Sequence, residues 1–366
     1  MSLKMTMNPG AEGDFITLDW GPATDVRRML IDLGRTKSYR AMSSALAAMK
    51  RFELFVITHI DADHIEGAMP FVKPAVPAFD TAEVWFNGYD HLIAAKARLS
   101  HLREPFAPGQ GEKLTDGIRK FGWEKRWNAA FGSGPVSVDS PEAAHPIELA
   151  GGLTLRLLSP SDRELAALEP TWRKVIENVG LAPGQPDLVE PDVPGRERFG
   201  ILDVESLARD RFEEDTSTPN GTSIAFLAEF AGKRLLLTGD AHPGRLESSL
   251  RLLGASEDNR MKIDCFKVSH HGSKANTSPS LLKIIDCTRF AFSTDGTKHD
   301  HPNPQTIARI LKADQDRPKQ LIFNFRQPNT TIWDNERLKR DYAYTCVFPP
   351  DGKEGVAVDC SVTSAT

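Results

Sequence analysis

A short polar segment directly after an apolar run restricts what this chain can fold into. Residues 58–64 read Thr-His-Ile-Asp-Ala-Asp-His and follow residues 54–57, which the pattern predicts to be a buried strand. The strand end fixes the backbone, and the turn after it lets alternate side chains converge. Imidazole and carboxylate groups recur there at the spacing that a divalent metal requires, on His59, Asp61, Asp63 and His64. The segment predicts a metal site, against the alternative of a polar loop that holds these residues by chance.

Three further polar segments stand next to predicted elements later in the chain. Asp240 follows an apolar strand and a glycine, His270 and His271 follow another strand, and His301 precedes a helix predicted over residues 304–312. Each segment alone is an ordinary turn. Their joint occurrence predicts a shared metal site, because sets of histidine and carboxylate ligands at strand ends are the usual construction of such sites.

Composition sets the outer bounds. The 366 residues can bury a full core and permit one large domain or two smaller ones, and 26% charged and 40% hydrophobic residues are ordinary for a soluble globular protein. A formal net charge of -5 argues against coating nucleic acid through bulk positive charge, although a local basic groove stays open. We see no secretory signal and no bilayer-spanning apolar stretch, and four sparse cysteines predict buried thiols. We therefore expect a cytoplasmic protein with no membrane association.

Predicted strands and helices alternate from end to end, which permits an α/β fold. The patterns also predict a short helix over residues 43–51, a hairpin of residues 223–230 and 234–238, and a helix capped by Ser278 with Pro279 at its first position.

Two stretches depart from this alternation. Residues 90–130 are predicted to be helical and basic around Trp123 and Trp127. We favour a solvated helical face with inward tryptophans over a surface that holds a nucleic-acid strand. Residues 181–220 are rich in Pro, Asp and Glu and are predicted to be an acidic surface insertion, a connection rather than a lid.

Together these segments resemble the metallo-β-lactamase superfamily, and within it the nuclease-like domains related to ComEC competence proteins. The resemblance follows the family's order and spans most of the chain, through residues 10–14, 30–34, 58–64, 157–160, 220–223, 238–240, 270–273 and 301–304. The His-x-Asp-x-Asp-His and His-His-Gly-Ser motifs are specific, whereas Gly-Asp and Asn-x-Thr-Ser are weak alone. The resemblance implies one domain over residues 1–366 with a four-layer αββα fold, in which two mixed sheets lie face to face, helices lie outside and metals bind at one edge.

The resemblance also implies a site for two divalent ions. Six side chains are implied as ligands, with Asp240 bridging both ions: His59 and Asp61 for the first ion, and Asp63, His64 and His271 for the second.

Other residues are implied around the ions. Asp32 matches a family aspartate that supports the ligand loop from behind. His270 and His301 are either further ligands or groups that contact substrate, and His301 is the candidate proton donor to the leaving oxygen if it is not a ligand. Ser273 and Lys274 lie shortly before a predicted helix start and offer donors to a phosphate group.

Two departures from the commoner superfamily pattern bear on the metal. Asp61 stands where a second histidine is usual, and Asn220, which we assign to substrate binding, stands where an isolated histidine is usual. Both changes remove imidazole and leave the first site harder. We expect zinc, with manganese as the alternative, and a weakly filled first site stays open. The same changes argue against β-lactam hydrolysis.

The reaction we predict is metal-dependent hydrolysis of a phosphodiester, in nucleic acid or a nucleotide, with Asp63, Asp240 and His301 as catalytic residues. Two ions roughly 3.5–4 Å apart lower the pKa of a bridging water and polarise the scissile group. A second hypothesis is hydrolysis of a small ester, thioester or lactone, or another small anionic substrate, by the same ions. A third is a degenerate, non-catalytic binding protein of this fold, to which Asn220 gives weight.

Overall fold

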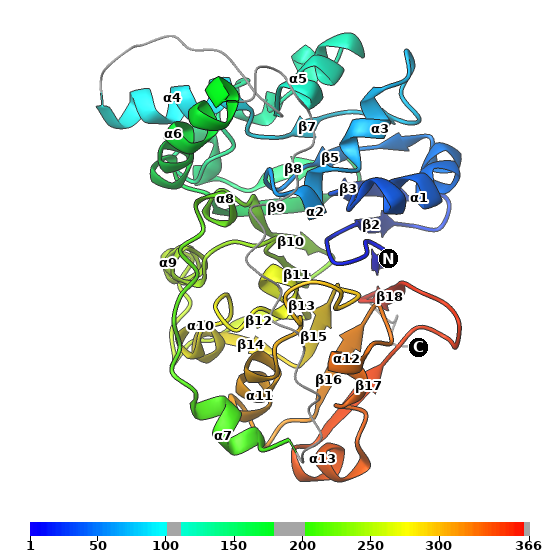
Figure 1. Cartoon of the computed structure of the whole chain (residues 1–366), viewed down its shortest axis with the longest axis vertical. Coiled ribbons are helices and arrows are strands. Elements are labelled where there is room, and N and C mark those ends of the chain that lie inside the picture. Colours follow the sequence, from blue (N-terminus) through cyan, green and yellow to red (C-terminus); the bar gives the residue numbers. More distant parts are fainter. Residues whose placement is uncertain (101–110, 179–201, 362–366) are drawn as a thin grey trace.

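Two large sheets dominate the computed structural model, which describes residues 1–100, 111–178 and 202–361 (Figure 1). One is six-stranded, in the order β18-β1-β2-β3-β5-β7. In chain order its strands are β1 (Ser2–Met7), β2 (Ile16–Gly21), β3 (Arg27–Ile31), β5 (Leu54–Val56), β7 (Val84–Trp85) and β18 (Val356–Asp359). The β3–β5 and β5–β7 pairs are parallel and the β1–β2 and β2–β3 pairs antiparallel, so this sheet is mixed.

The second large sheet has eight strands in the order β17-β16-β15-β13-β11-β10-β9-β8. Its strands are β8 (Ile147–Leu149), β9 (Leu153–Ser159), β10 (Ala225–Phe230), β11 (Lys233–Leu237), β13 (Cys265–Lys267), β15 (Arg289–Phe292), β16 (Lys319–Phe323) and β17 (Tyr344–Val347). The strands from β11 to β17 are parallel, and β8 to β11 are antiparallel. Two small pairs complete the strands: β4 (Arg51–Phe52) with β6 (Asp80–Thr81), and β12 (Met261–Ile263) with β14 (Ile285–Cys287).

An apolar layer joins the facing sides of the two large sheets. On β11, Leu235 and Leu237 belong to this layer, whereas Leu236 packs in the layer on the opposite side of the sheet. On β3, Ile31 lies in the layer between the sheets and Leu30 lies on the opposite side. Because successive side chains of a strand point to opposite faces, strands buried on both faces are apolar throughout.

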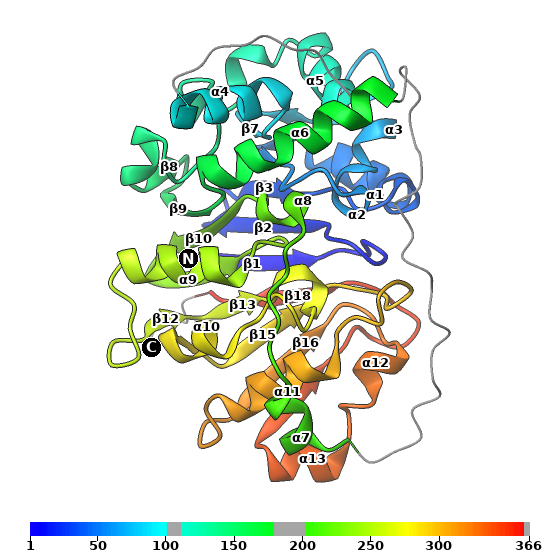
Figure 2. The ribbon, with the colours of Figure 1, turned by 60° about the vertical axis from the view of Figure 1, so that its left-hand side comes forward.

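Helices cover the two outward faces (Figure 2). Buried side chains on the outer side of the six-stranded sheet come from α1 (Thr36–Met49), α2 (Ala62–Ile65), α3 (Ala68–Val72), α4 (Tyr89–Ser100), α5 (Gly111–Lys120) and α6 (Asp162–Asn178). Those on the outer side of the eight-stranded sheet come from α7 (Val204–Arg209), α9 (Pro243–Leu252), α10 (Pro279–Ile284), α11 (Pro304–Lys312) and α13 (Glu336–Asp341). The four-layer αββα arrangement expected from the resemblance is therefore confirmed.

Shorter helical turns connect these layers. They are α8 (Thr218–Gly221), α12 (Pro328–Thr331), η1 (Glu124–Arg126), η2 (Ala129–Phe131), η3 (Pro141–Ala144) and η4 (Ser269–Gly272). No helix among the described residues combines the length and the hydrophobicity needed to traverse a bilayer.

Several predicted elements are confirmed. Strands β10 and β11 form the expected antiparallel hairpin, and α11 spans the helix predicted at residues 304–312. The Ser278 side chain accepts a hydrogen bond from the Leu281 N–H with Pro279 at the first helical position, so the predicted cap is present. In the basic stretch at residues 90–130, α4, α5 and η1 are helical, and residues 101–110 lie outside the described part. Residues 181–201 of the predicted acidic insertion also lie outside the described part of the chain.

Near the N-terminus, one strand was not predicted and one helix was predicted with the wrong bounds. The unpredicted strand is β1, whose alternating Leu3, Met5 and Met7 are buried between the sheets. The helix predicted over residues 43–51 begins at Thr36 and ends at Met49. The first half of this helix has few apolar residues besides the buried Tyr39. The alanine-rich pattern therefore predicted only the second half of the helix.

Candidate metal centre

The ends of several strands meet at one edge of the two sheets. Strand β5 leads into residues 58–64, β11 leads to Asp240, and β13 leads into η4 with His270 and His271. Because β11, β13 and β15 run parallel, their carboxyl ends lie along the same edge. Polar side chains that are far apart in the sequence are brought together there.

Asp240 lies at the centre of this cluster. Its Oδ2 is 3.4 Å from Nε2 of His64, 3.7 Å from Nε2 of both His270 and His271, and 3.9 Å from Nε2 of His59. The carboxylate is buried. One carboxylate oxygen thus faces four imidazole nitrogens, which is a suitable position for a ligand shared between two ions.

Among the described residues, four groups of three side chains have ligand atoms within 4.8 Å of one another. Two consist of predicted ligands only, His59, His64 and Asp240 in one and Asp63, His64 and His271 in the other, and the remaining two include Asp14. In the second group, Oδ2 of Asp63 is 3.1 Å from Nε2 of His271. His64 belongs to both groups, whereas the sequence analysis placed it with the second ion only.

Buried ligand atoms in this cluster lack hydrogen-bond partners in the part of the chain that the structure describes. They are Nε2 of His59, His64 and His271, and Oδ1 of Asp240. The three Nε2 atoms face carboxylate oxygens of Asp63 and Asp240 at 3.1 to 3.9 Å without forming a hydrogen bond. Unpaired buried polar atoms are costly and uncommon in folded proteins. A divalent cation would satisfy all of them, so the donor set fits a metal centre.

The ring of His64 is held from behind by Asp32. Oδ2 of Asp32 is 2.7 Å from Nδ1 of His64, and both side chains are buried. The same carboxylate accepts hydrogen bonds from the backbone N–H and the hydroxyl of Thr58, each at 2.7 Å. A carboxylate behind a histidine fixes its ring orientation and keeps Nε2 free for a metal, which is the supporting role expected of Asp32.

The other two imidazoles are also fixed through Nδ1. His59 Nδ1 lies 3.1 Å from the Ser223 hydroxyl, and His271 Nδ1 donates to the backbone carbonyl of Ser293 at 2.8 Å. The Ser223 hydroxyl also accepts the Asp240 N–H at 3.1 Å, so it links two of the cluster's segments. The Nε2 atoms are therefore presented in defined directions.

The carboxylates and imidazoles of the cluster shift one another's pKa values. Burial disfavours charge on each group, yet His64 and His271 hold the pKa values of Asp63 and Asp240 far below the usual range. Against the same burial, the neighbouring carboxylates raise the pKa of His64 well above its ordinary value and that of His271 to about 10. The raised pKa values favour protons on His64 and His271 beside the carboxylates, and divalent ions would displace these protons.

Asp61 takes a more peripheral position than the other predicted ligands. Its Oδ2 is 3.5 Å from Nε2 of His59, but its side chain is 36% exposed and belongs to none of the close groups. Its role as a ligand of the first ion stays a prediction.

A hydrogen-bonded network lies beside the centre around His270. Its Nδ1 is 2.9 Å from Oδ1 of Asn276, and Oδ2 of Asp215 accepts from Nδ2 of Asn220 at 2.7 Å and of Asn276 at 2.9 Å. Burial raises the pKa of Asp215, but His270, followed by Asn220 and Asn276, lowers it below the usual range. Sequence reasoning singled out Asn220 and His270 but missed Asp215 and Asn276, whose only signal was proximity in sequence to a motif residue.

His301 lies next to His270, with ring centroids 5.2 Å apart. The side chain is buried and its Nδ1 lacks a hydrogen-bond partner within the described residues. Burial, together with the nearby rings of His270 and His271, lowers the pKa of His301 well below its ordinary value. The ring is therefore neutral and offers one N–H donor and one acceptor.

The two residues predicted to contact phosphate differ in exposure. The Ser273 side chain is buried and its hydroxyl accepts the Ala275 N–H at 3.2 Å, which stabilises the turn. Lys274 is exposed, and its backbone N–H donates to Oδ1 of Asn303. Only Lys274 presents its side chain to solvent.

The two tryptophans of the basic stretch, Trp123 and Trp127, pack inward. Both indoles are buried, and Nε1 of Trp127 donates to the backbone carbonyl of Phe86 at 2.8 Å. Neither tryptophan therefore offers a face on which a base could stack.

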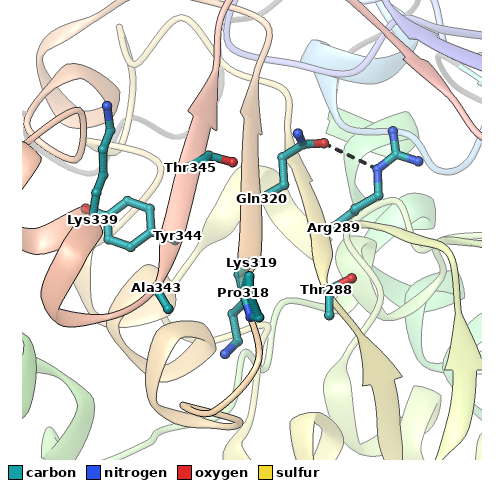
Figure 3. A pocket seen from close by; sticks show the side chains of 9 residues that line it. All are labelled: Thr288, Arg289, Pro318, Lys319, Gln320, Lys339, Ala343, Tyr344 and Thr345. Atoms are coloured by element: carbon teal, nitrogen blue, oxygen red, sulfur yellow. Dashed lines mark hydrogen bonds between the residues drawn. The ribbon is translucent and has the colours of Figure 1, made fainter.

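A pocket of about 620 Å³ lies away from the metal centre, over β15, β16 and β17 (Figure 3). Its cationic side chains have partners: Arg289 donates to Gln320 at 3.4 Å, Lys319 donates to backbone carbonyls, and Lys339 donates to Glu336 at 3.0 Å. The pocket shares no residue with the metal centre.

No family model and no curated protein matches the chain. Among solved structures, it is similar to a protein from Parabacteroides distasonis ATCC 8503 described as a metal-dependent hydrolase, with 11% identity, a TM-score of 0.34, and 93% of this chain and 90% of that chain covered. It is also similar to Zn(2+)-bound PqqB from Methylobacterium extorquens, with 14% identity, a TM-score of 0.39, and coverage of 94% and 86%. At these identities and TM-scores neither match informs on substrate or mechanism, which must be argued from the site.

Proposed function

We propose that this chain is a metal-dependent hydrolase that cleaves phosphodiesters, with nucleic acid or a nucleotide as its substrate class. One observation carries the proposal: imidazoles from two separate segments, residues 58–64 and η4, converge on Asp240 of a third segment and leave buried ligand atoms without a hydrogen-bond partner. A purely structural polar cluster would pair these atoms internally, since unpaired buried groups are costly.

Five side chains would hold a pair of divalent ions: His59, Asp63, His64, Asp240 and His271. Ions bound there would supply Lewis acidity and a nucleophilic water at neutral pH. Asp61, next to His59, would add a carboxylate to the more exposed side.

The ligand set supports a phosphate-containing substrate. Asp63 and Asp240 contribute two carboxylates beside three imidazoles, and Asp61 lies close enough to His59 to add a third carboxylate. Carboxylates make the set harder than an all-imidazole site, and divalent ions held in such a set can bind phosphate oxygens. Zinc or manganese both remain compatible with the mixture of imidazole and carboxylate.

Groups beside the centre support an anionic substrate. The His270 side chain is 24% exposed while its Nε2 lies 3.7 Å from Asp240, so a substrate can reach it from solvent. The neutral His301 ring lies beside His270 and would donate a hydrogen bond from its N–H to the leaving oxygen. Lys274 adds an exposed cation two residues beyond η4.

Hydrolysis assays with the purified protein test the proposal. The protein, loaded with zinc or manganese, would be incubated with bis-nitrophenyl phosphate, single-stranded DNA, RNA and a panel of lactones and thioesters. We expect cleavage of phosphodiesters that is abolished by EDTA and by Asp240→Asn. Hydrolysis of lactones or thioesters alone would refute the substrate class.

Metal analysis separates these enzymatic functions from a degenerate binding protein. We expect between one and two ions per chain after metal-replete purification. Fewer than one ion per chain, with no hydrolysis of any substrate, would favour the non-catalytic alternative.

A further inference from the structure

A buried ion pair lies directly behind the metal centre. Lys267, the last residue of β13, donates from Nζ to Oδ2 of Asp14 at 2.5 Å, and the two side chains are only 1% and 2% exposed. A cavity of about 10 Å³ next to the pair is lined largely by apolar residues of the layer between the sheets. The pair is therefore separated from bulk water.

Stability alone does not account for such a pair. Removing two charges from water is costly, and apolar side chains of similar volume often stabilise a protein as well or better. Removing one partner, by contrast, leaves an uncompensated buried charge. Lys267 and Asp14 therefore require another explanation, and their neighbours provide one.

Asp14 uses only one of its oxygens on Lys267. The other, Oδ1, is buried, has no hydrogen-bond partner among the described residues, and lies 3.6 Å from Nδ1 of His271. The same Nδ1 donates to the carbonyl of Ser293. Two acceptors on this side favour a proton on Nδ1, which leaves Nε2 of His271 free to face Asp63 and Asp240.

The arrangement repeats the relation between Asp32 and His64. In both places a buried carboxylate stands behind the Nδ1 of an imidazole whose Nε2 faces the centre. Asp32 is anchored by neutral donors of Thr58, whereas Asp14 is anchored by an ammonium group. Each histidine therefore has a carboxylate on its Nδ1 side, at 2.7 Å for Asp32 and at 3.6 Å for Asp14.

The loop that carries Asp14 also touches the ligand segment. A Cβ atom on Gly13 would lie 1.8 Å from the backbone oxygen of Asp63, and the Ser293 hydroxyl donates to the Gly13 carbonyl at 3.1 Å. A shift of Asp14 would therefore be transmitted to Asp63 and Ser293 as well as to His271.

We infer that Asp14 and Lys267 act together as positioning residues for the metal-binding face of His271. Asp14 orients the imidazole, and Lys267 holds Asp14 in place and offsets its charge. The inference rests on the metal site of the proposed function and is independent of the substrate. It requires that loss of the pair weakens metal binding even where the fold is intact.

Cobalt(II), used as a spectroscopic probe, tests this with Asp14→Asn, Lys267→Met and the double variant Asp14→Leu/Lys267→Met. The double variant replaces the pair by apolar groups, so its thermal midpoint in EDTA should recover relative to Lys267→Met. Its affinity for cobalt, measured by competition with a chelator, should stay about 10–100-fold below wild type, with an altered visible absorption spectrum. The control is the double variant Lys233→Met/Asp264→Asn, which replaces an ion pair outside the metal centre. Its cobalt affinity and its visible spectrum should equal those of wild type.

The outcomes are distinct. Wild-type cobalt affinity and spectrum in the double variant, at a recovered thermal midpoint, would show a purely structural pair and overturn the inference. If the double variant does not fold, the same unchanged readouts in the isosteric Asp14→Asn overturn it. A wild-type protein that binds no cobalt overturns both the inference and the proposed function. One that binds cobalt but cleaves no phosphodiester overturns only the substrate assignment.

Discussion

Asp32 and His64 form a buried contact in which Oδ2 of the carboxylate lies 2.7 Å from Nδ1 of the imidazole. Neither side chain is exposed, and the carboxylate is itself held by two hydrogen bonds from Thr58. The His64 ring cannot rotate without breaking this contact. The direction of its Nε2, toward Asp240, is therefore set before any metal arrives.

Replacing Asp32 by Asn should weaken zinc binding by about 10–100-fold, the usual effect of losing a carboxylate behind a metal-binding histidine. The amide keeps the shape but loses the charge that favours a proton on Nδ1 of His64. Competition with a chromophoric chelator measures the affinity. The exposed Asp25, paired with Arg27, supplies the control Asp25→Asn, which should bind zinc normally. Wild-type affinity in Asp32→Asn would remove this aspartate from the metal centre.

Asp240 and Asp61 should differ in importance because only Asp240 faces several imidazoles. Asp240→Asn should reduce bound metal to less than one ion per chain. It should also lower the rate of phosphodiester hydrolysis further than the loss of a residue that only supports a ligand, which typically costs about 10–100-fold. Asp61→Asn removes a 36% exposed carboxylate outside the close groups and should have the smaller effect on both quantities. Metal content and hydrolysis rate measure the difference. Equal losses in the two variants would contradict the central role of Asp240.

The meeting of strand ends could be predicted from local patterns, whereas the four-layer architecture was expected from the family resemblance. Apolar runs predicted β5, β11 and β13, and each is followed by polar side chains. The ends of neighbouring parallel strands share an edge, so Asp240 and His271 come together although they are 31 positions apart in the sequence. A local pattern at each strand end thus predicts contacts that are distant in sequence.

Other features depend on partners that no local pattern reveals. Strand β1 pairs with β2 and with β18, so its stability derives partly from residues 356–359 at the other end of the chain. Asp215 contacts Asn276 across 61 residues, and Lys267 contacts Asp14 across 253. A buried lysine within an apolar strand was the available signal for the last of these, because such a charge requires a partner.

Gly13→Ala should disturb the metal centre from outside the ligand set. The new Cβ would lie 1.8 Å from the backbone oxygen of Asp63, which no rotamer change can relieve. We expect a loss of about 1–3 kcal/mol in the free energy of unfolding, as for other overpacked sites, together with weaker zinc binding. Denaturant unfolding and chelator competition measure the two effects.

Gly244→Ala is the matched control for Gly13→Ala. Its Cβ would meet only the carboxylate end of Glu214, a flexible side chain that can move. Zinc affinity should therefore stay at the wild-type value. If Gly13→Ala behaves in the same way, the loop does not press on Asp63 as the structure indicates.

His91 should make the stability of the protein depend on pH between about 4 and 6.5, independently of metal. Burial lowers the pKa of His91 from 6.5 to about 4, against a smaller opposing effect of Asp90. The Gly88 N–H donates to Nδ1 at 3.1 Å, and the ring edge lies against Trp127, so the folded site holds the neutral ring. The unfolded chain binds a proton more readily, and stability therefore falls as the pH drops through this window.

Replacement of His91 by Asn tests this dependence, because the amide oxygen can accept the Gly88 N–H without titrating. Between pH 7.5 and 5, wild type should lose about 2 kcal/mol more unfolding free energy than His91→Asn, as a shift from 6.5 to about 4 requires. Denaturant unfolding in EDTA at the two pH values gives both quantities. Other groups titrate in the same range, but they are common to the two proteins and cancel in the difference. Equal losses in both proteins would mean that His91 has an ordinary pKa in the folded state. The inference that the folded site holds a neutral His91 ring would then be wrong.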